Sequence, residues 1–136
     1  MKTVADIVAE HEKREGPLLP ILHDVQNAFG YVSEDAMREI AGALNLTRAE
    51  VYGVVSFYHD FRKDAETRPV IKLCRAEACK ARGGEKLMPI ADSQSRVKIE
   101  AVYCLGLCSV GPAAMIGDQV YARLDRERLA ELMETA

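Results

Sequence analysis

Pro69-Val70-Ile71-Lys72-Leu73-Cys74 separates two stretches of different character. This segment is short, mostly apolar and rich in β-branched residues, and it opens with a proline, which a strand accepts at its first position. It predicts a β-strand that ends on a cysteine. None of the four cysteines of the 136-residue chain precedes it. We therefore expect two domains, a helical bundle over residues 1–66 and a cysteine-containing domain over residues 67–136.

The sequence beyond this strand continues as an α/β pattern. The expected elements are a helix over 78–90 despite Gly83-Gly84, a half-buried strand over 97–103, a hairpin that pairs 113–116 with 119–122, and a helix over 126–133. Gly117-Asp118 supplies the hairpin with a two-residue turn whose first residue is glycine, as type II′ turns prefer. Strand, helix, strand, hairpin and helix in this order are close to the thioredoxin-like layout, with a right-handed crossover.

Residues 1–66 carry the periodicity of helices. Apolar residues recur at helical spacing at Val4, Ile7, Val8, Leu18, Leu19, Leu22, Val25 and Phe29. Gly30 is placed to end a helix, Ser33 to begin the next one, and Thr47 with Glu50 forms a capping box before a fourth apolar segment. About four short helices are expected. We expect an aromatic cluster of Phe57, Tyr58 and Phe61 to pack in the core. The alternative is that it forms a patch on the surface that faces a partner protein.

Composition excludes several classes of protein. Lys and Arg total 18 against 21 Asp and Glu, and the net charge of −3 gives no field that would attract nucleic acid or an anionic membrane. No run of eighteen apolar residues occurs, and acidic residues interrupt the N-terminal apolar positions, so neither a membrane span nor a signal peptide is expected. We expect a cytoplasmic protein, in which cysteines serve as metal ligands or redox groups more often than as disulfides.

The four cysteines form two pairs, Cys74 with Cys79 and Cys104 with Cys108, and each pair starts where a predicted strand ends. Loops that leave the carboxyl ends of neighbouring strands lie close together, so both pairs can reach one site. Four thiolates suit Zn²⁺ or an iron–sulfur cluster. The wide spacings favour a [2Fe-2S] cluster, whose two iron atoms spread the ligands, over an interaction module built on a four-cysteine zinc site. Two disulfides remain an alternative.

Several motifs resemble one known family. Besides the cysteine pairs, they include Cys104-Leu105-Gly106-Leu107-Cys108 with Pro112 beyond it, Gly117-Asp118-Gln119-Val120-Tyr121, Phe29-Gly30-Tyr31-Val32 and Val51-Tyr52-Gly53-Val54-Val55-Ser56-Phe57-Tyr58. Together they resemble the thioredoxin-like [2Fe-2S] subunit of NADH dehydrogenase and its relatives over nearly the whole chain. Cys74-Arg75-Ala76-Glu77-Ala78-Cys79 is most similar to the gamma subunit of cytoplasmic, NAD-dependent, molybdenum-containing formate dehydrogenase. Gly111 stands where NADH dehydrogenase members usually have alanine.

This resemblance implies an electron-transfer subunit that turns over no substrate by itself. Cys74, Cys79, Cys104 and Cys108 would hold one [2Fe-2S] cluster. The partners implied are an FMN- and NAD-binding subunit, together with further iron–sulfur and molybdenum subunits of a formate dehydrogenase. The alternative is the equivalent subunit of an NADH dehydrogenase or of an NAD-linked hydrogenase. Residues 1–66, with 7 basic and 12 acidic residues, would serve assembly.

Overall fold

The computed structural model describes residues 1–136. The chain forms two compact units, a helical unit over Met1–Glu66 and a cysteine unit over Thr67–Ala136. None of the helices combines the length and the apolar character that crossing a membrane would require.

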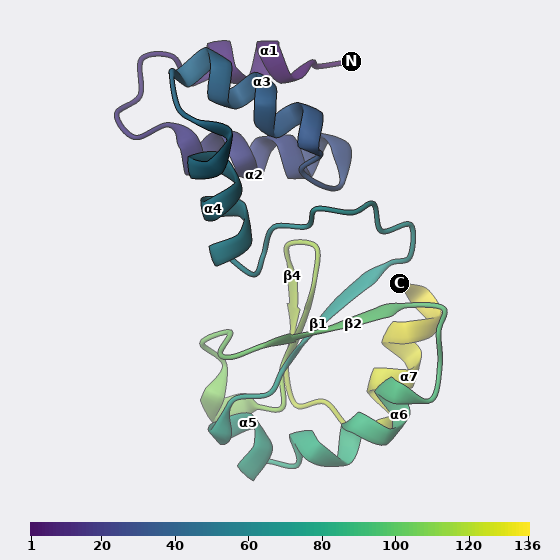
Figure 1. Ribbon diagram of the computed structural model, residues 1–136. Coiled ribbons are helices and arrows are strands. Elements are labelled where there is room, and N and C mark those ends of the chain that lie inside the picture. Colours follow the sequence, from purple (N-terminus) through teal and green to yellow (C-terminus); the bar gives the residue numbers. More distant parts are fainter. The chain divides into compact units, whose positions relative to one another are not determined.

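The helical unit contains the four short helices that its periodicity predicts (Figure 1). They are α1 (Val4–Glu10), α2 (Leu18–Phe29), α3 (Glu34–Leu44) and α4 (Arg48–Phe57). The predicted boundaries are confirmed. Gly30 ends α2 in the left-handed conformation with φ 83°, and the Ser33 hydroxyl accepts a hydrogen bond from Ala36 N at 3.1 Å at the start of α3. Thr47 and Glu50 form the expected capping box at the start of α4.

The core of the helical unit lies between these helices. It is built from fully or almost fully buried apolar side chains, among them Ile7, Ile21, Leu22, Val25, Met37, Ile40, Val51 and Val55. The chain after α4 folds back onto this core, since Arg62 N donates to Gln26 Oε1 at 2.6 Å and Gln26 Nε2 donates to Asp60 O at 2.6 Å. This return buries Phe61 but leaves Phe57 73% exposed. The core-packing prediction is therefore confirmed for Phe61 and wrong for Phe57 and for Tyr58, which is 42% exposed, because both lie at the end of α4 outside the packed helices.

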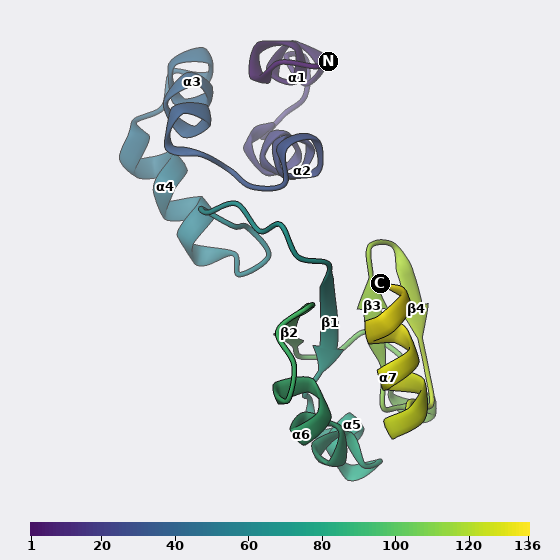
Figure 2. The ribbon, with the colours of Figure 1, turned by 90° about the vertical axis from the view of Figure 1, so that its right-hand side faces the viewer.

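The cysteine unit is built on a four-stranded sheet with the strand order β2-β1-β3-β4 (Figure 2). The strands are β1 (Val70–Cys74), β2 (Lys98–Val102), β3 (Ala114–Ile116) and β4 (Gln119–Tyr121). β1 and β2 are parallel with Cys74 opposite Val102, and β3 pairs antiparallel with both β1 and β4. Gly117 has φ 56° and Asp118 has no positive φ, which matches the predicted type II′ pattern at the hairpin.

The crossover between β1 and β2 differs from the prediction. One helix was expected over 78–90, but the structure contains α5 (Glu77–Ala81), the 3₁₀ helix η1 (Gly84–Leu87) and α6 (Met88–Asp92). The break falls at Gly83, which has φ 98°. A residue in this left-handed conformation cannot continue an α-helix, and glycine adopts it without the steric cost that a side chain brings.

One face of the sheet carries the core of the cysteine unit. Ile71 and Leu73 alternate onto this face of β1 and are almost completely buried. They pack in the same cluster as Leu87 and Ala91 from the crossover and Leu129, Leu132 and Met133 from α7 (Arg126–Thr135). Helices α6 and α7 accordingly lie on the same side of the strands (Figure 1). The cysteine unit has the predicted α/β, thioredoxin-like layout.

Candidate metal centre

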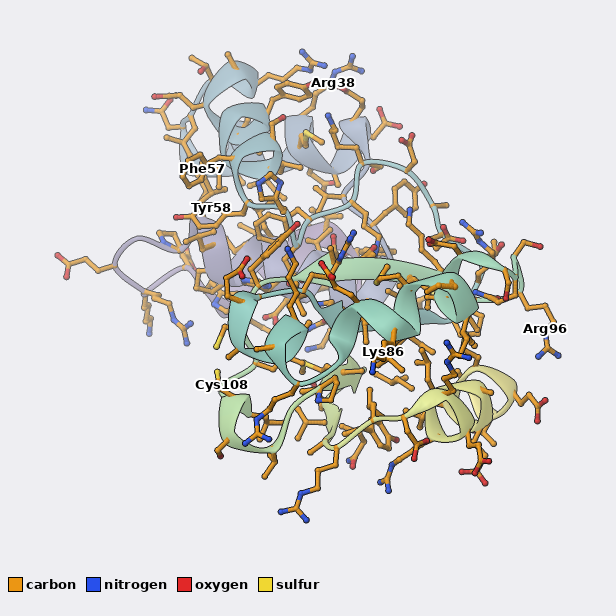
Figure 3. The ribbon with its side chains drawn as sticks, turned by 90° about the horizontal axis from the view of Figure 1, so that it is seen from below. Arg38, Phe57, Tyr58, Lys86, Arg96 and Cys108 are labelled. Carbon is orange, nitrogen blue, oxygen red and sulfur yellow. The ribbon has the colours of Figure 1, made fainter.

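The structure places the four cysteines at one end of the sheet. Cys74 is the last residue of β1 and Cys79 lies in α5. Cys104 follows β2, and Cys108 begins the short 3₁₀ helix η2 (Cys108–Val110). Because β1 and β2 are parallel, both loops leave the same edge of the sheet. Figure 3 shows Cys108 at the margin of the unit, on the turn beside α5.

Cys74 and Cys79 form a buried inner pair. Each is only 2% exposed, and with Ala113 they make a small apolar cluster against Ala76, Val102, Leu105 and Leu107. Loss of hydration raises the pKa of the Cys79 thiol, and its hydrogen bond with the Cys74 thiol raises it further. A hydrogen bond from the Ala113 backbone to the Cys79 sulfur acts in the opposite direction. Binding of a metal would therefore have to displace protons from a buried thiol.

Cys104 and Cys108 form an exposed outer pair. Their Sγ atoms lie 3.6 Å apart, and Gly106 N donates a hydrogen bond to Cys104 Sγ at 3.3 Å. The Gly106 N–H lowers the pKa of Cys104, and the Cys108 thiol lowers it further, whereas the hydrogen bond and charge of Cys104 raise the pKa of Cys108. Gly106 has φ 75°, a conformation that glycine adopts without strain. The loop thus aims a backbone donor at a sulfur atom.

The backbone of Cys104 is strained. Its φ is 127°, and it is one of three residues other than glycine with a positive φ, together with Asn45 and Arg123. Such conformations cost on the order of 1–3 kcal/mol and persist where the surrounding structure enforces them, often at functional sites. Here the strain falls on a residue that carries a candidate metal ligand.

The separation of the outer pair's sulfur atoms fits two ligands on one metal ion. The four cysteines are free thiols. Two thiolates on one tetrahedral ion, with metal–sulfur bonds of about 2.3 Å, lie roughly 3.8 Å apart, close to the separation within the outer pair. However, no three side chains of His, Cys, Asp or Glu in the chain surround a single ion position. The 3.6 Å separation within the outer pair suits two thiolates on one metal ion, as found both in zinc sites and in iron–sulfur clusters.

The two pairs are close enough for their charges to interact. Cys74 and Cys108 interact electrostatically, and so do Cys79 and Cys108. All four sequence-predicted residues thus lie at one end of the sheet, and thiolate donors in this number are the ligands that an iron–sulfur cluster uses. The residues present, four free thiols, therefore fit a [2Fe-2S] group.

Sequence reasoning missed the residues that pack around the inner pair. Ala113 accepts a hydrogen bond from Cys74 N at 3.0 Å and hydrogen-bonds the Cys79 sulfur with its own backbone. Gly84 and Gly111 both approach Cys79 closely enough that a Cβ on either would crowd it. Ala113 carries no chemical signal in the sequence, and neither glycine can be distinguished from an ordinary turn residue before its neighbours in space are known.

Comparison with known proteins places this site in context. Residues 4–136 match the family described as thioredoxin-like [2Fe-2S] ferredoxin. The NADP-reducing hydrogenase subunit HndA of Solidesulfovibrio fructosivorans is 27% identical over 143 residues, which cover 97% of this chain and 84% of that subunit. A subunit of the NADH-quinone oxidoreductase of Aquifex aeolicus (strain VF5) is 29% identical over 132 residues, which cover 89% and 82% of the two chains.

Two solved structures share the fold. Crystal structures of NAD⁺-reducing [NiFe]-hydrogenase, in the H₂-reduced and air-oxidized states, match with TM-scores of 0.68 and 0.72 at 25% identity. Each match covers 88% of this chain but only 22% of the hydrogenase chain. The likeness therefore extends over both units of this chain and over a small part of the larger one.

Proposed function

The chain belongs to the thioredoxin-like [2Fe-2S] ferredoxin family, and we propose that it is an electron-transfer subunit of an NADH dehydrogenase-type or NAD(P)-linked hydrogenase-type complex. Its cofactor is a [2Fe-2S] cluster. The proposed ligands are Cys74, Cys79, Cys104 and Cys108. The observation that supports this ligand set is the convergence of two thiol pairs, one buried and one exposed, at the carboxyl ends of the parallel strands β1 and β2.

The residues of this chain would hold and tune the group. When bound, a [2Fe-2S] cluster supplies a one-electron redox centre. The Gly106 N–H stabilises the Cys104 thiolate, and the Ala113 backbone supports the Cys79 sulfur. Burial of the inner pair excludes water from one side, whereas exposure of the outer pair opens the other side to a partner protein.

The proposed partner is a subunit that binds a flavin and a nicotinamide nucleotide. Hydride transfer moves two electrons, so a flavin is needed between a nicotinamide and a one-electron centre. The names of the relatives support this class of complex, since they are subunits of NADH-quinone oxidoreductase and of an NADP-reducing hydrogenase. A cytoplasmic location belongs to the same proposal.

Formate dehydrogenase is the second candidate for the parent complex. The loop Cys74-Arg75-Ala76-Glu77-Ala78-Cys79 favours it by its resemblance to the gamma subunit. A molybdenum subunit would then be a further partner. The comparisons favour the hydrogenase or NADH dehydrogenase class, because relatives of that class match along most of their length.

The cofactor and its ligands are tested on the chain produced and purified without oxygen. We expect two irons and two acid-labile sulfides per chain, and visible absorption that bleaches on one-electron reduction. Replacing any of the four cysteines by serine should remove or destabilise the cluster, because a hard oxygen replaces a soft anionic sulfur. Ser109→Ala, which alters an exposed neighbour of Cys108, is the matched control. One zinc without iron would contradict the proposal, as would unaltered spectra in all four serine variants.

The parent complex is tested by isolating the native assembly through a tag on this chain and identifying its other subunits. A flavin subunit accompanied by hydrogenase or quinone-reductase subunits would support the first candidate. A molybdenum subunit with formate-oxidising activity would support the second. With the flavin subunit alone, NADH should reduce the cluster if its measured potential permits. Failure under that condition would reject the proposed partnership.

A further inference from the structure

The backbone conformation at Gly111 does not require a glycine. It has φ −66° and ψ 168°, an extended conformation open to any residue. In contrast, five other glycines have a positive φ, and a Cβ added to any of them would meet nothing within 4 Å. A Cβ on Gly111 would lie 3.0 Å from Cys79 Sγ and 3.5 Å from Cys79 Cα. Gly111 is buried, so its missing side chain provides space rather than conformational freedom.

The sulfur atom at this contact has little room to move. Cys79 is 2% exposed and hydrogen-bonds both the Ala113 backbone and the Cys74 thiol. Gly84 crowds the same residue from another segment, because a Cβ there would lie 2.8 Å from the Cys79 carbonyl oxygen. Two glycines that are 27 positions apart in the sequence therefore border one cysteine. No other cysteine sulfur is among the atoms nearest to an added glycine Cβ.

We propose that Gly111, at the position where NADH dehydrogenase members usually have alanine, is a positioning residue for Cys79 in this chain: the missing side chain determines where the Cys79 sulfur lies here, and an alanine would hold that sulfur elsewhere. The proposal rests on the proposed function only in treating that sulfur as a cluster ligand. A methyl group at position 111 would require the Cys79 Sγ, 3.0 Å from the added Cβ, to move by a few tenths of an ångström. Residues that orient a metal ligand affect the affinity and the electronic properties of the metal group.

The contact is tested first in the metal-free protein by a double-mutant cycle. The variants are Gly111→Ala, Cys79→Ala and the combination of both, and urea unfolding gives their folding equilibrium constants. We expect Gly111→Ala to lower this constant by about fivefold or more when Cys79 is present, which is the lower end of overpacking costs. The effect should fall below about twofold in the Cys79→Ala background, because the sulfur is gone.

The cycle remains decisive if Gly111→Ala fails to fold. In that case the combined variant should fold, because removing the sulfur removes the clash. A combined variant that remains unfolded, or a Gly111→Ala effect that is the same in both backgrounds, would overturn the proposal. The control is Gly42→Ala, which makes the same chemical change at a site with no positive φ and no atom within 4 Å of the added Cβ.

The positioning role is tested in the cluster-loaded protein. The g-values of the reduced cluster and its visible circular dichroism should change in Gly111→Ala and stay unchanged in Gly42→Ala. The larger Gly111→Val should lower cluster retention by about tenfold, in line with the effect of losing a partner of a metal ligand. If Gly111→Ala and Cys79→Ala are coupled in the metal-free protein but Gly111→Ala leaves the spectra of the loaded cluster unchanged, the positioning role is wrong. The contact is then one of packing alone. Iron and sulfide analysis shows separately whether the chain binds the proposed cluster at all. The metal-free cycle needs no cluster, so it tests the contact even if the proposed function is wrong.

Discussion

The two cysteine pairs have different backbone and solvent environments. Cys79 of the inner pair is buried and crowded by neighbouring backbone, whereas Cys104 of the outer pair is exposed and holds a positive φ. The Gly106 N–H favours the charged form of Cys104, and burial favours the neutral form of Cys79. These contrasts exist before any metal binds, so they can be measured on the metal-free protein.

The strain at Cys104 predicts an unusual stability effect. Cys104→Gly should be more stable than Cys104→Ala by about 1 kcal/mol. Glycine adopts φ 127° without strain, whereas the Cβ of alanine is strained in this conformation as the Cβ of cysteine is. Urea unfolding of the two metal-free variants measures the difference. At Cys108, which has no positive φ, alanine should be as stable as glycine or more so. Equal stability of the two variants at position 104 would indicate an unstrained backbone.

The pKa directions predict an order of thiol reactivity. The lowered pKa of Cys104 means that its thiolate forms at a lower pH than usual, and the raised pKa of Cys79 means that its thiolate forms at a higher pH. Iodoacetamide reacts with thiolates, so as pH rises Cys104 should be alkylated before Cys79. Mass spectrometry of the metal-free protein, labelled at a series of pH values, measures the order of alkylation. The difference between the two cysteines should disappear when the protein is unfolded in urea. Faster labelling of Cys79 in the folded chain would contradict the burial of its thiol.

The crossover of the cysteine unit is the element whose geometry matters most for the site. Its three short helical segments turn at Gly83 and bring Gly84 against the Cys79 carbonyl. α5 spans five residues and carries Cys79, so packing of its neighbours holds it more than its own hydrogen bonds do.

Gly84→Ala should therefore destabilise the metal-free protein. The added Cβ would lie 2.8 Å from backbone oxygen, which cannot turn aside as a side chain can, and overpacking of this kind costs about 1–3 kcal/mol. Urea unfolding measures the loss. The control is Gly53→Ala in α4, which meets nothing within 4 Å and should be neutral or slightly stabilising. If Gly84→Ala leaves the stability unchanged, the backbone of the crossover can move to accommodate the added Cβ.

On the scale of the whole chain, charge is unevenly distributed between the two units. The helical unit has a net charge of −5, and the cysteine unit, with 11 basic and 9 acidic residues, has +2. The helical unit also exposes Phe57, which packs edge-on against Tyr58 with ring centroids 5.0 Å apart. Tyr58 borders an apolar groove of about 380 Å³ lined by leucines of α2 and by Leu44 and Leu46. Such a surface is typical of a contact with another protein.

Phe57→Ser should weaken binding of the proposed flavin subunit while leaving the cluster spectrum unchanged. Exposed aromatic residues are frequent interface hot spots, so we expect a loss of about tenfold or more in affinity, measured by calorimetry with the purified partner. Val120→Ser is the matched control, since Val120 is 51% exposed on β4 of the other unit. If Phe57→Ser leaves the affinity unchanged, the assembly role assigned to this surface of residues 1–66 is wrong.

Local signals in the sequence determined most of the secondary structure. Gly30, Ser33 and Thr47 mark helix boundaries because capping depends on a few adjacent residues. The strand over 70–74 and the hairpin at Gly117-Asp118 follow from alternation and turn preference, which are also local. The cysteine spacing and the strand ends predicted which thiols would share a site.

Only the tertiary structure decided which thiols are buried and what surrounds them. The break at Gly83 cannot be read from the sequence with certainty, because glycine is tolerated within a helix when packing compensates. The burial of Cys79, the exposure of Phe57 and the space that Gly84 and Gly111 leave all depend on segments distant in sequence. The environment of a side chain depends on residues that are close in space but distant in sequence, and a local sequence pattern does not predict these contacts.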